Sequence, residues 1–85
     1  ESIYYIESMG DYIRLVTATQ AIITHGTMLQ FLNILPANKF CRIHKSFTIN
    51  LDLIDYFEGN TISLKGKKLA VGKAYREDFL ETWRK

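Results

Sequence analysis

The sequence predicts a mostly β fold, an elongated antiparallel β-strand domain with one short helix and a C-terminal helix. Short runs rich in β-branched and aromatic residues recur along the chain, and turn signals such as Gly10-Asp11 and Gly59-Asn60 separate them. A chain of 85 residues has room for one core, so residues 1–85 are expected to form a single domain. The hydrophobic content of 47% is sufficient for that core and argues against disorder.

Three strands and a helix are predicted in the first half of the chain. The strands cover residues 3–7, 12–18 and 21–24, and short turns separate them. Thr27 then has the features of an N-cap, and Gln30 three residues later completes a capping box. Apolar residues follow at helical spacing until Pro36, which cannot continue a helix. We therefore expect a helix of about two turns that covers an open edge or a face of the sheet.

The central stretch, residues 40–50, is the most informative one and reads FCRIHKSFTIN. Successive side chains of a strand point to opposite faces, so Arg42 and His44 share a polar face and the positions beside them are apolar. Strict alternation would place Lys45 on the apolar face. We expect instead a bend or bulge at Lys45-Ser46, which turns the lysine outward to where it can contact a partner.

The last part of the chain predicts three short strands and a closing helix. After a turn within residues 51–55, strands are expected near residues 54–58, 61–65 and 68–71. Gly72 is placed to cap a final helix over residues 74–83. The apolar residues of this helix share one side, and they are Tyr75, Phe79, Leu80 and Trp83.

Charge is unevenly distributed, although the net charge is only +2. Residues 1–38 hold one basic and three acidic residues, a net of −2, whereas residues 39–85 hold ten basic and six acidic residues, a net of +4. A polyanion would therefore meet the second half more favourably than the first. Lys65, Lys67 and Lys68 are expected only to solvate a turn.

Catalytic and metal chemistry find little support in the residues. His44 and Ser46, with an aspartate downstream, do not make a hydrolase triad, because no nucleophile elbow or oxyanion hole accompanies them. His44 is expected instead to hold the bend by a hydrogen bond to the backbone. Cys41, His25 and His44 lack the paired spacing of a metal site, and no glycine-rich phosphate loop is present. We therefore predict no enzyme, no metal and no cofactor.

Cysteine content and hydropathy bear on the cellular compartment. The single cysteine, Cys41, cannot form an internal disulfide and is expected to be a buried thiol, which suits a reducing compartment. No apolar run approaches the roughly 18 residues of a membrane span, and no signal-peptide pattern opens the sequence. We expect a cytoplasmic protein without a membrane partner.

Three motifs in order resemble those of the LytTR DNA-binding domain family. The central motif is RIHKSFTIN at residues 42–50, which fits the pattern R-x-H-K-S-[FY]-x-[IV]-N. Before the central motif, the segment YYIESMGDYIRL resembles the family's opening hairpin. After the central motif, the segment LAVGKAYREDF resembles the family's closing hairpin. The resemblance covers nearly the whole chain, and three motifs in the right order are much more specific than one.

The resemblance implies sequence-specific binding of double-stranded DNA by loops inserted into successive major grooves. The implied contact loops are residues 9–13, 45–46 and 72–76. The candidate DNA-binding residues within them are Asp11, Tyr12, Ile13, Lys45, Ser46, Lys73 and Arg76. We expect Lys45 to read a base edge and Arg76 to meet a phosphate, with Lys73 able to do either. Ala74, where the family often has a second base, and Gly72, where it usually has serine, weaken the third loop.

The resemblance also implies a cellular role. It is that of the effector domain of a bacterial two-component response regulator, excised from a longer protein and lacking its N-terminal receiver domain. The implied partners are repeated promoter sites on DNA and, in the full protein, a receiver domain and a sensor kinase. The isolated domain is expected to be a monomer that pairs on DNA. Because the sequence starts about one strand late in the family pattern, one sheet edge is expected to be unpaired.

A small protein–protein interaction module is the alternative. Such a module would need an exposed apolar patch, for which Trp83 and Phe79 are the candidates.

Overall fold

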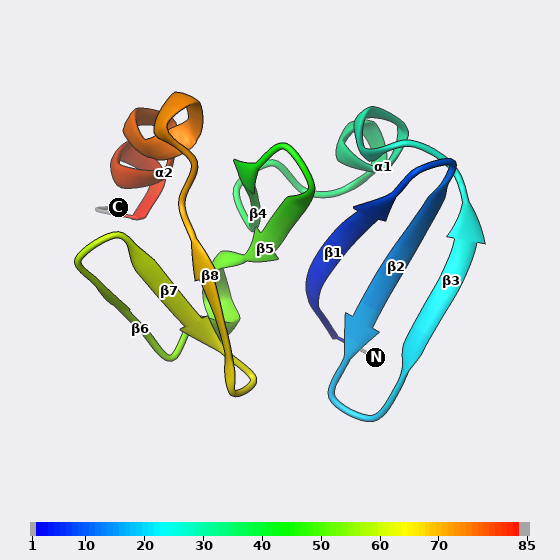
Figure 1. Cartoon of the computed structure of the whole chain (residues 1–85), viewed down its shortest axis with the longest axis horizontal. Coiled ribbons are helices and arrows are strands. Elements are labelled where there is room, and N and C mark those ends of the chain that lie inside the picture. Colours follow the sequence, from blue (N-terminus) through cyan, green and yellow to red (C-terminus); the bar gives the residue numbers. More distant parts are fainter. Residues whose placement is uncertain (1, 84–85) are drawn as a thin grey trace.

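Two antiparallel sheets and two helices make up the described part of the chain (Figure 1). The computed structural model describes residues 2–83. The five-stranded sheet has the order β3-β2-β1-β5-β4, and the three-stranded sheet has the order β6-β7-β8. The strands are β1 (Ile3–Met9), β2 (Tyr12–Thr17), β3 (Ala21–His25), β4 (Phe40–His44), β5 (Phe47–Asn50), β6 (Tyr56–Glu58), β7 (Thr61–Leu64) and β8 (Lys67–Ala70). The helices are α1 (Met28–Ile34) and α2 (Arg76–Trp83), with 3₁₀ turns at Leu51–Leu53 and Lys73–Tyr75. The predicted mostly β, antiparallel class is confirmed.

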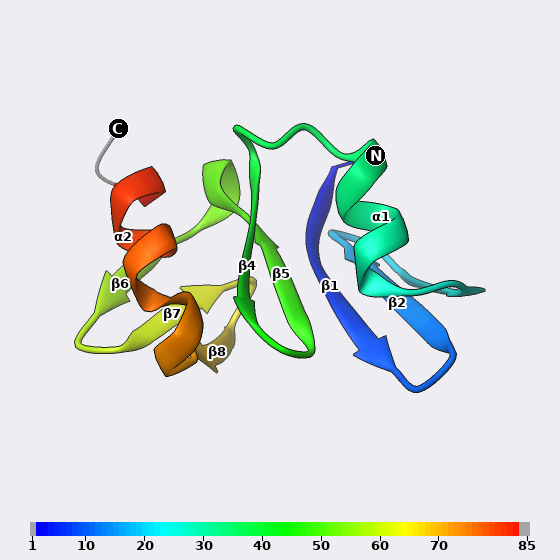
Figure 2. The same cartoon turned by 90° about the horizontal axis from the view of Figure 1, so that it is seen from above.

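The middle of the five-stranded sheet is covered on both faces, whereas its edge strand β3 is mostly exposed. Neighbouring residues of β1 point to opposite sides, and both Tyr5 and Ile6 are buried. Ile6 packs with Ile13 and Met28 under α1. Tyr5 belongs to a larger core on the other face, which continues into the three-stranded sheet and α2. Figures 1 and 2 show the resulting arrangement, with α1 beside β1–β3 at one end of the long axis and α2 beside β6–β8 at the other.

Helix α1 begins and ends as predicted. The Thr27 hydroxyl accepts a hydrogen bond from the Gln30 backbone N–H at 3.3 Å, and the Gln30 side chain accepts one from the Thr27 N–H at 2.8 Å. These bonds satisfy two N–H groups that the helix itself leaves free, so the predicted capping box is confirmed. The helix ends at Ile34, before Pro36, and it covers a face of the sheet rather than its edge.

The central stretch forms two strands with a turn between them. Strands β4 and β5 pair antiparallel, so the chain reverses completely at Lys45-Ser46. The predicted bend at Lys45-Ser46 is therefore confirmed. A register shift between Arg42 and His44 adds a β-bulge just before this turn.

Two later predictions need correction. Helix α2 begins at Arg76, because the chain first forms the 3₁₀ turn Lys73–Tyr75. The expectation that the lysines of the β7–β8 region only solvate a turn is wrong for two of them. The Lys65 ammonium donates a hydrogen bond to the Thr17 carbonyl. The Lys67 ammonium lies over the Tyr5 ring at 5.7 Å and so contacts the five-stranded sheet.

Candidate nucleic-acid interface

The three loops predicted to contact DNA emerge along one long side of the molecule. They are the first turn (Gly10-Asp11, between β1 and β2), the central turn (Lys45-Ser46, between β4 and β5) and the junction (residues 72–76, between β8 and α2). Strand β1 is antiparallel to both β2 and β5, so the turn that leaves β1 and the turn that enters β5 lie at one end of the sheet. Figures 1 and 2 both place the three loops in a row along the long axis.

Backbone hydrogen bonds fix the loops to one another. The Ser8 N–H donates to the Ser46 carbonyl at 2.8 Å, which joins the strand end before the first turn to the central turn. The Gly72 N–H donates to the Ile43 carbonyl at 2.6 Å, which joins the junction to β4. The row of loops is therefore one connected structure.

The first turn exposes Asp11 and Tyr12. Gly10 has φ of +66°, a conformation that glycine adopts without strain, and this lets the chain reverse in two residues. The backbone of Asp11 is held by a hydrogen bond from the Gly26 N–H at 3.1 Å. The Tyr12 side chain is 43% exposed, and its ring lies 4.2 Å from that of His25 at the end of β3. The Tyr12 ring is therefore accessible at the surface, as a contact residue must be.

Ile13 cannot present its side chain to DNA. It is 0% exposed and packs with Ile6 and Met28 beneath α1. Because strand residues alternate, the exposure of Tyr12 places its neighbour in the core. We therefore withdraw Ile13 from the candidate contact residues.

The central turn is held by the side chain of His44. The Ser46 N–H donates to His44 Nδ1 at 3.0 Å, so the predicted hydrogen bond between His44 and the backbone is confirmed. Lys45 is exposed, and within residues 2–83 its side chain forms no ion pair or hydrogen bond. Ser46 is half-buried. The turn therefore presents a free ammonium group on a backbone that is held in place.

Among the described residues 2–83, the side chain of Lys73 in the junction has no partner, whereas that of Arg76 is restrained. Lys73 is exposed. Arg76 is half-buried, its guanidinium donates to the Asn60 side-chain oxygen and it lies over the Phe57 ring at 5.9 Å. The remaining N–H groups of that guanidinium are available to a ligand. Gly72 fits closely here, because a Cβ at this position would meet the Tyr75 ring at 3.2 Å.

Sequence reasoning missed Arg42. Its guanidinium reaches the backbone carbonyls of the central turn and lies over the ring of Tyr75 in the junction. The polar face that Arg42 shares with His44 was a signal that it points away from the core. The position of Tyr75 relative to Arg42 depends on the tertiary fold.

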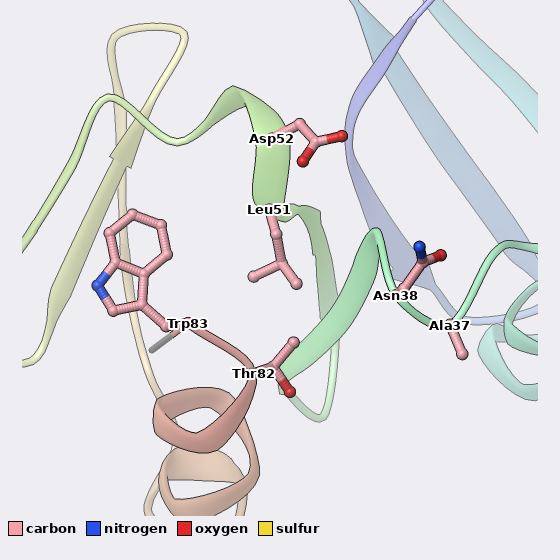
Figure 3. A pocket seen from close by; sticks show the side chains of 6 residues that line it. All are labelled: Ala37, Asn38, Leu51, Asp52, Thr82 and Trp83. Carbon is pink, nitrogen blue, oxygen red and sulfur yellow. The ribbon is translucent and has the colours of Figure 1, made fainter. Parts of the chain in front are cut away.

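A hollow lies on the opposite side of the molecule from the three loops. It has a volume of about 550 Å³ and lies between the α1–β4 loop, the Leu51–Leu53 turn and the end of α2 (Figure 3). Leu51 and Thr82 point into it, and Trp83 and Asp52 lie at its rim. Phe79 is fully buried, so only Trp83, at 39% exposed, remains of the predicted apolar patch.

Burial also explains the chemistry of the single thiol. Cys41 is buried in the larger core, as predicted. Burial raises the pKa of this thiol, and the nearby Asp78 carboxylate raises it further. The thiol is therefore kept protonated and unreactive at neutral pH.

The described residues offer neither a cluster of metal ligands nor a helix that could span a membrane. Within residues 2–83, no group of three or more histidine, cysteine, aspartate or glutamate side chains is arranged to hold a metal ion. None of the helices in that range combines the length and the hydropathy required to cross a bilayer.

Comparison with known proteins gives the same family as the motifs. The LytTr DNA-binding domain family matches residues 1–84. The sensory transduction protein LytT of Bacillus anthracis is 26% identical over 84 aligned residues, which cover 92% of this chain and 34% of that protein. This chain thus spans about a third of the length of that relative. A solved LytTr DNA-binding domain of a response regulator from Bacillus cereus superposes with a TM-score of 0.84 at 21% identity, covering 94% of this chain and 79% of that one. The chain belongs to the LytTr DNA-binding domain family.

Proposed function

We propose that this DNA-binding domain reads a specific duplex sequence with its three loops, which enter successive major grooves. The observation that carries the proposal is the row of loops along one long side, each with an exposed polar or basic side chain. The molecule is 32 Å along its longest axis, close to the roughly 34 Å of one B-DNA turn. Loops at the two ends of such a row can reach major grooves one turn apart on a single face of the duplex.

The loops differ in the contacts that they can make. Lys45 is a free cation on a fixed turn, and we assign it a base edge, with guanine O6 and N7 as the natural acceptors. Ser46 can donate to a neighbouring base or phosphate. Asp11 can accept from a cytosine amino group, and the Tyr12 ring can pack on the sugar-phosphate backbone.

The junction is assigned mainly to the backbone of DNA. The guanidinium of Arg76 is already held by Asn60 and Phe57, so it can offer its remaining N–H groups to a phosphate. Lys73 is exposed on the same loop and can reach either a phosphate or a base. Such contacts position the protein without carrying sequence information.

The experiment starts from selection of bound sequences out of a random duplex pool. Binding of the selected and a scrambled duplex is then titrated at several salt concentrations, and guanine N7 methylation interference maps the contacted grooves. We expect a preference for the selected duplex and interference at two guanine clusters about 10 base pairs apart. Equal affinity for both duplexes, or interference in a single groove only, would contradict the proposal.

We further propose a setting within a larger regulator. The domain is the effector part of a bacterial two-component response regulator in the cytoplasm, preceded by a receiver domain that a sensor kinase phosphorylates. Support comes from the relative LytT, which is described as a sensory transduction protein and of which this chain matches about a third. Phosphorylation of the full protein should then tighten binding to paired promoter sites, and a full protein whose affinity is unchanged by phosphorylation would contradict this setting.

The isolated domain is proposed to be a monomer that pairs only on DNA. Sedimentation at micromolar concentration should give the mass of one chain of 9.9 kDa without DNA. With a duplex that carries two neighbouring sites, two chains should bind. A tight dimer in the absence of DNA would refute this.

A further inference from the structure

Arg42 lies where two of the contact loops approach each other. Its neighbours in β4, Cys41 and Ile43, point into the core, so the arginine side chain points away from it. The β-bulge between Arg42 and His44 then alters the path of the strand just before the central turn. This brings the guanidinium beside the turn that follows it.

The guanidinium bonds to two successive carbonyls of the turn. Arg42 Nε donates to the His44 carbonyl at 3.3 Å, and Nη2 donates to the Lys45 carbonyl at 2.5 Å. Both bonds are charge-assisted, and the planar fork of arginine can make them simultaneously. A lysine ammonium is a single point on a flexible stem and does not reproduce this geometry. Holding the Lys45 carbonyl fixes the direction in which the Lys45 side chain leaves the turn.

The same guanidinium contacts the junction. It lies over the Tyr75 ring, with its central carbon 5.7 Å from the ring centroid. Two backbone bonds lie close by, from the Gly72 N–H to the Ile43 carbonyl at 2.6 Å and from the Tyr75 N–H to the Gly72 carbonyl at 2.9 Å. Arg42 is therefore a side chain that contacts both the central turn and the junction.

We propose that Arg42 is a positioning residue that holds the central turn and the junction in one fixed arrangement, so that Lys45 and Lys73 meet DNA together. This inference rests on the proposed function of these loops. Arg42 acts through the loop residues, because two of its N–H groups are already bonded within the turn. Its contribution is to sequence preference rather than to the attraction of phosphates.

The test compares variants that separate charge from geometry. Arg42→Lys keeps the charge and loses the fork, whereas Arg42→Gln loses both. Lys39→Gln is the matched control for charge, since Lys39 is exposed and pairs at 3.9 Å with Asp52, which lines the hollow on the opposite side. For Arg42→Lys we expect the affinity ratio between selected and scrambled duplexes to fall about tenfold, as for one lost base contact, while the salt slope stays unchanged.

Two results would overturn the proposal. One is an Arg42→Lys variant whose ratio stays within about twofold of the parent, which would mean that only the charge matters. The other is an Arg42→Gln variant that weakens both duplexes equally and lowers the salt slope by about one, which would identify a direct phosphate contact.

A measurement without DNA separates this inference from the proposed function. Amide hydrogen exchange of the free Arg42→Lys domain should be faster than in the parent both at Ser46 and at residues 72–75. Unchanged exchange at either segment would remove the positioning role, whatever the DNA result. If the parent domain shows no sequence preference, the proposed function fails, and exchange still decides whether Arg42 joins the loops.

Should Arg42→Lys not fold, Tyr75→Leu removes only the ring beneath the guanidinium. Faster exchange of the Tyr75→Leu domain both at Ser46 and at residues 72–75 would support the positioning role of Arg42. Unchanged exchange would overturn it.

Discussion

The first turn and the central turn lie at the same end of the sheet and are built in different ways. The first turn contains Gly10 at φ of +66°, a conformation that glycine adopts without strain and that lets the backbone reverse. The central turn, Lys45-Ser46, contains no glycine and is held by the side chains of Arg42 and His44. In the first turn the reversal depends on the conformation of glycine, whereas in the central turn side-chain hydrogen bonds hold the backbone.

This difference suggests a division of work between the two turns. A base edge must be met within hydrogen-bond distance and angle, which favours a side chain on a fixed backbone. Lys45 is on such a backbone. Asp11 and Tyr12 adjoin the first turn, whose reversal depends on the conformation of Gly10 rather than on such side-chain bonds. The comparison thus predicts that sequence preference depends more on the central turn than on the first.

The largest expected effect lies within the first loop, at Ile13. Ile13→Ala removes a fully buried side chain under α1 and should lower the free energy of unfolding by about 2–5 kcal/mol. Tyr12→Ala, one residue earlier, removes a 43% exposed ring and should cost much less. Urea denaturation followed by circular dichroism measures both. If Ile13→Ala retains stability and loses DNA binding instead, our placement of Ile13 in the core is wrong.

Loss of the Lys45 side chain should have the next largest effect, and that effect should be on sequence preference. Lys45→Ala should cost about 1–3 kcal/mol on the selected duplex and relax the preference at one position of the site. Asp11→Ala is the matched variant on the glycine turn and should change the preference less. Titrations on selected and scrambled duplexes decide between them. Equal weakening on both duplexes by Lys45→Ala would make Lys45 an electrostatic anchor only.

His44 provides a smaller test of how the central turn is held. His44→Ala removes the acceptor of the Ser46 N–H and should lower stability by about 0.5–1.5 kcal/mol, because His44 is exposed and water can replace part of the bond. Asn at this position can accept from the same N–H two residues on, so His44→Asn should recover most of the loss. Thermal unfolding of the two variants measures this. No difference between them would mean that the hydrogen bond contributes little to stability.

Features that depend on residues close together in the chain were predicted from the sequence, whereas contacts between residues far apart in the chain were not. The capping box of Thr27 and Gln30 and the turn at Gly10 are local features, and both are present where the sequence places them. Family motifs mark a loop but not the face on which each residue lies, which is why Ile13 was included among the contacts. The contact of Arg42 with Tyr75 joins two residues far apart in the chain. Only the tertiary fold brings that pair together.

The smallest expected effect is at Arg76 and tests the junction against the central turn. Its guanidinium is restrained by Asn60 and Phe57, so we expect it to meet a phosphate rather than a base. Arg76→Ala should therefore weaken selected and scrambled duplexes alike and reduce the salt slope by roughly one unit. Arg76→Lys keeps the charge and should restore most of that slope. The readout is the dependence of log Kd on log salt concentration for both duplexes. A loss confined to the selected duplex would instead assign a base contact to Arg76, and the junction would then share the reading of sequence with the central turn.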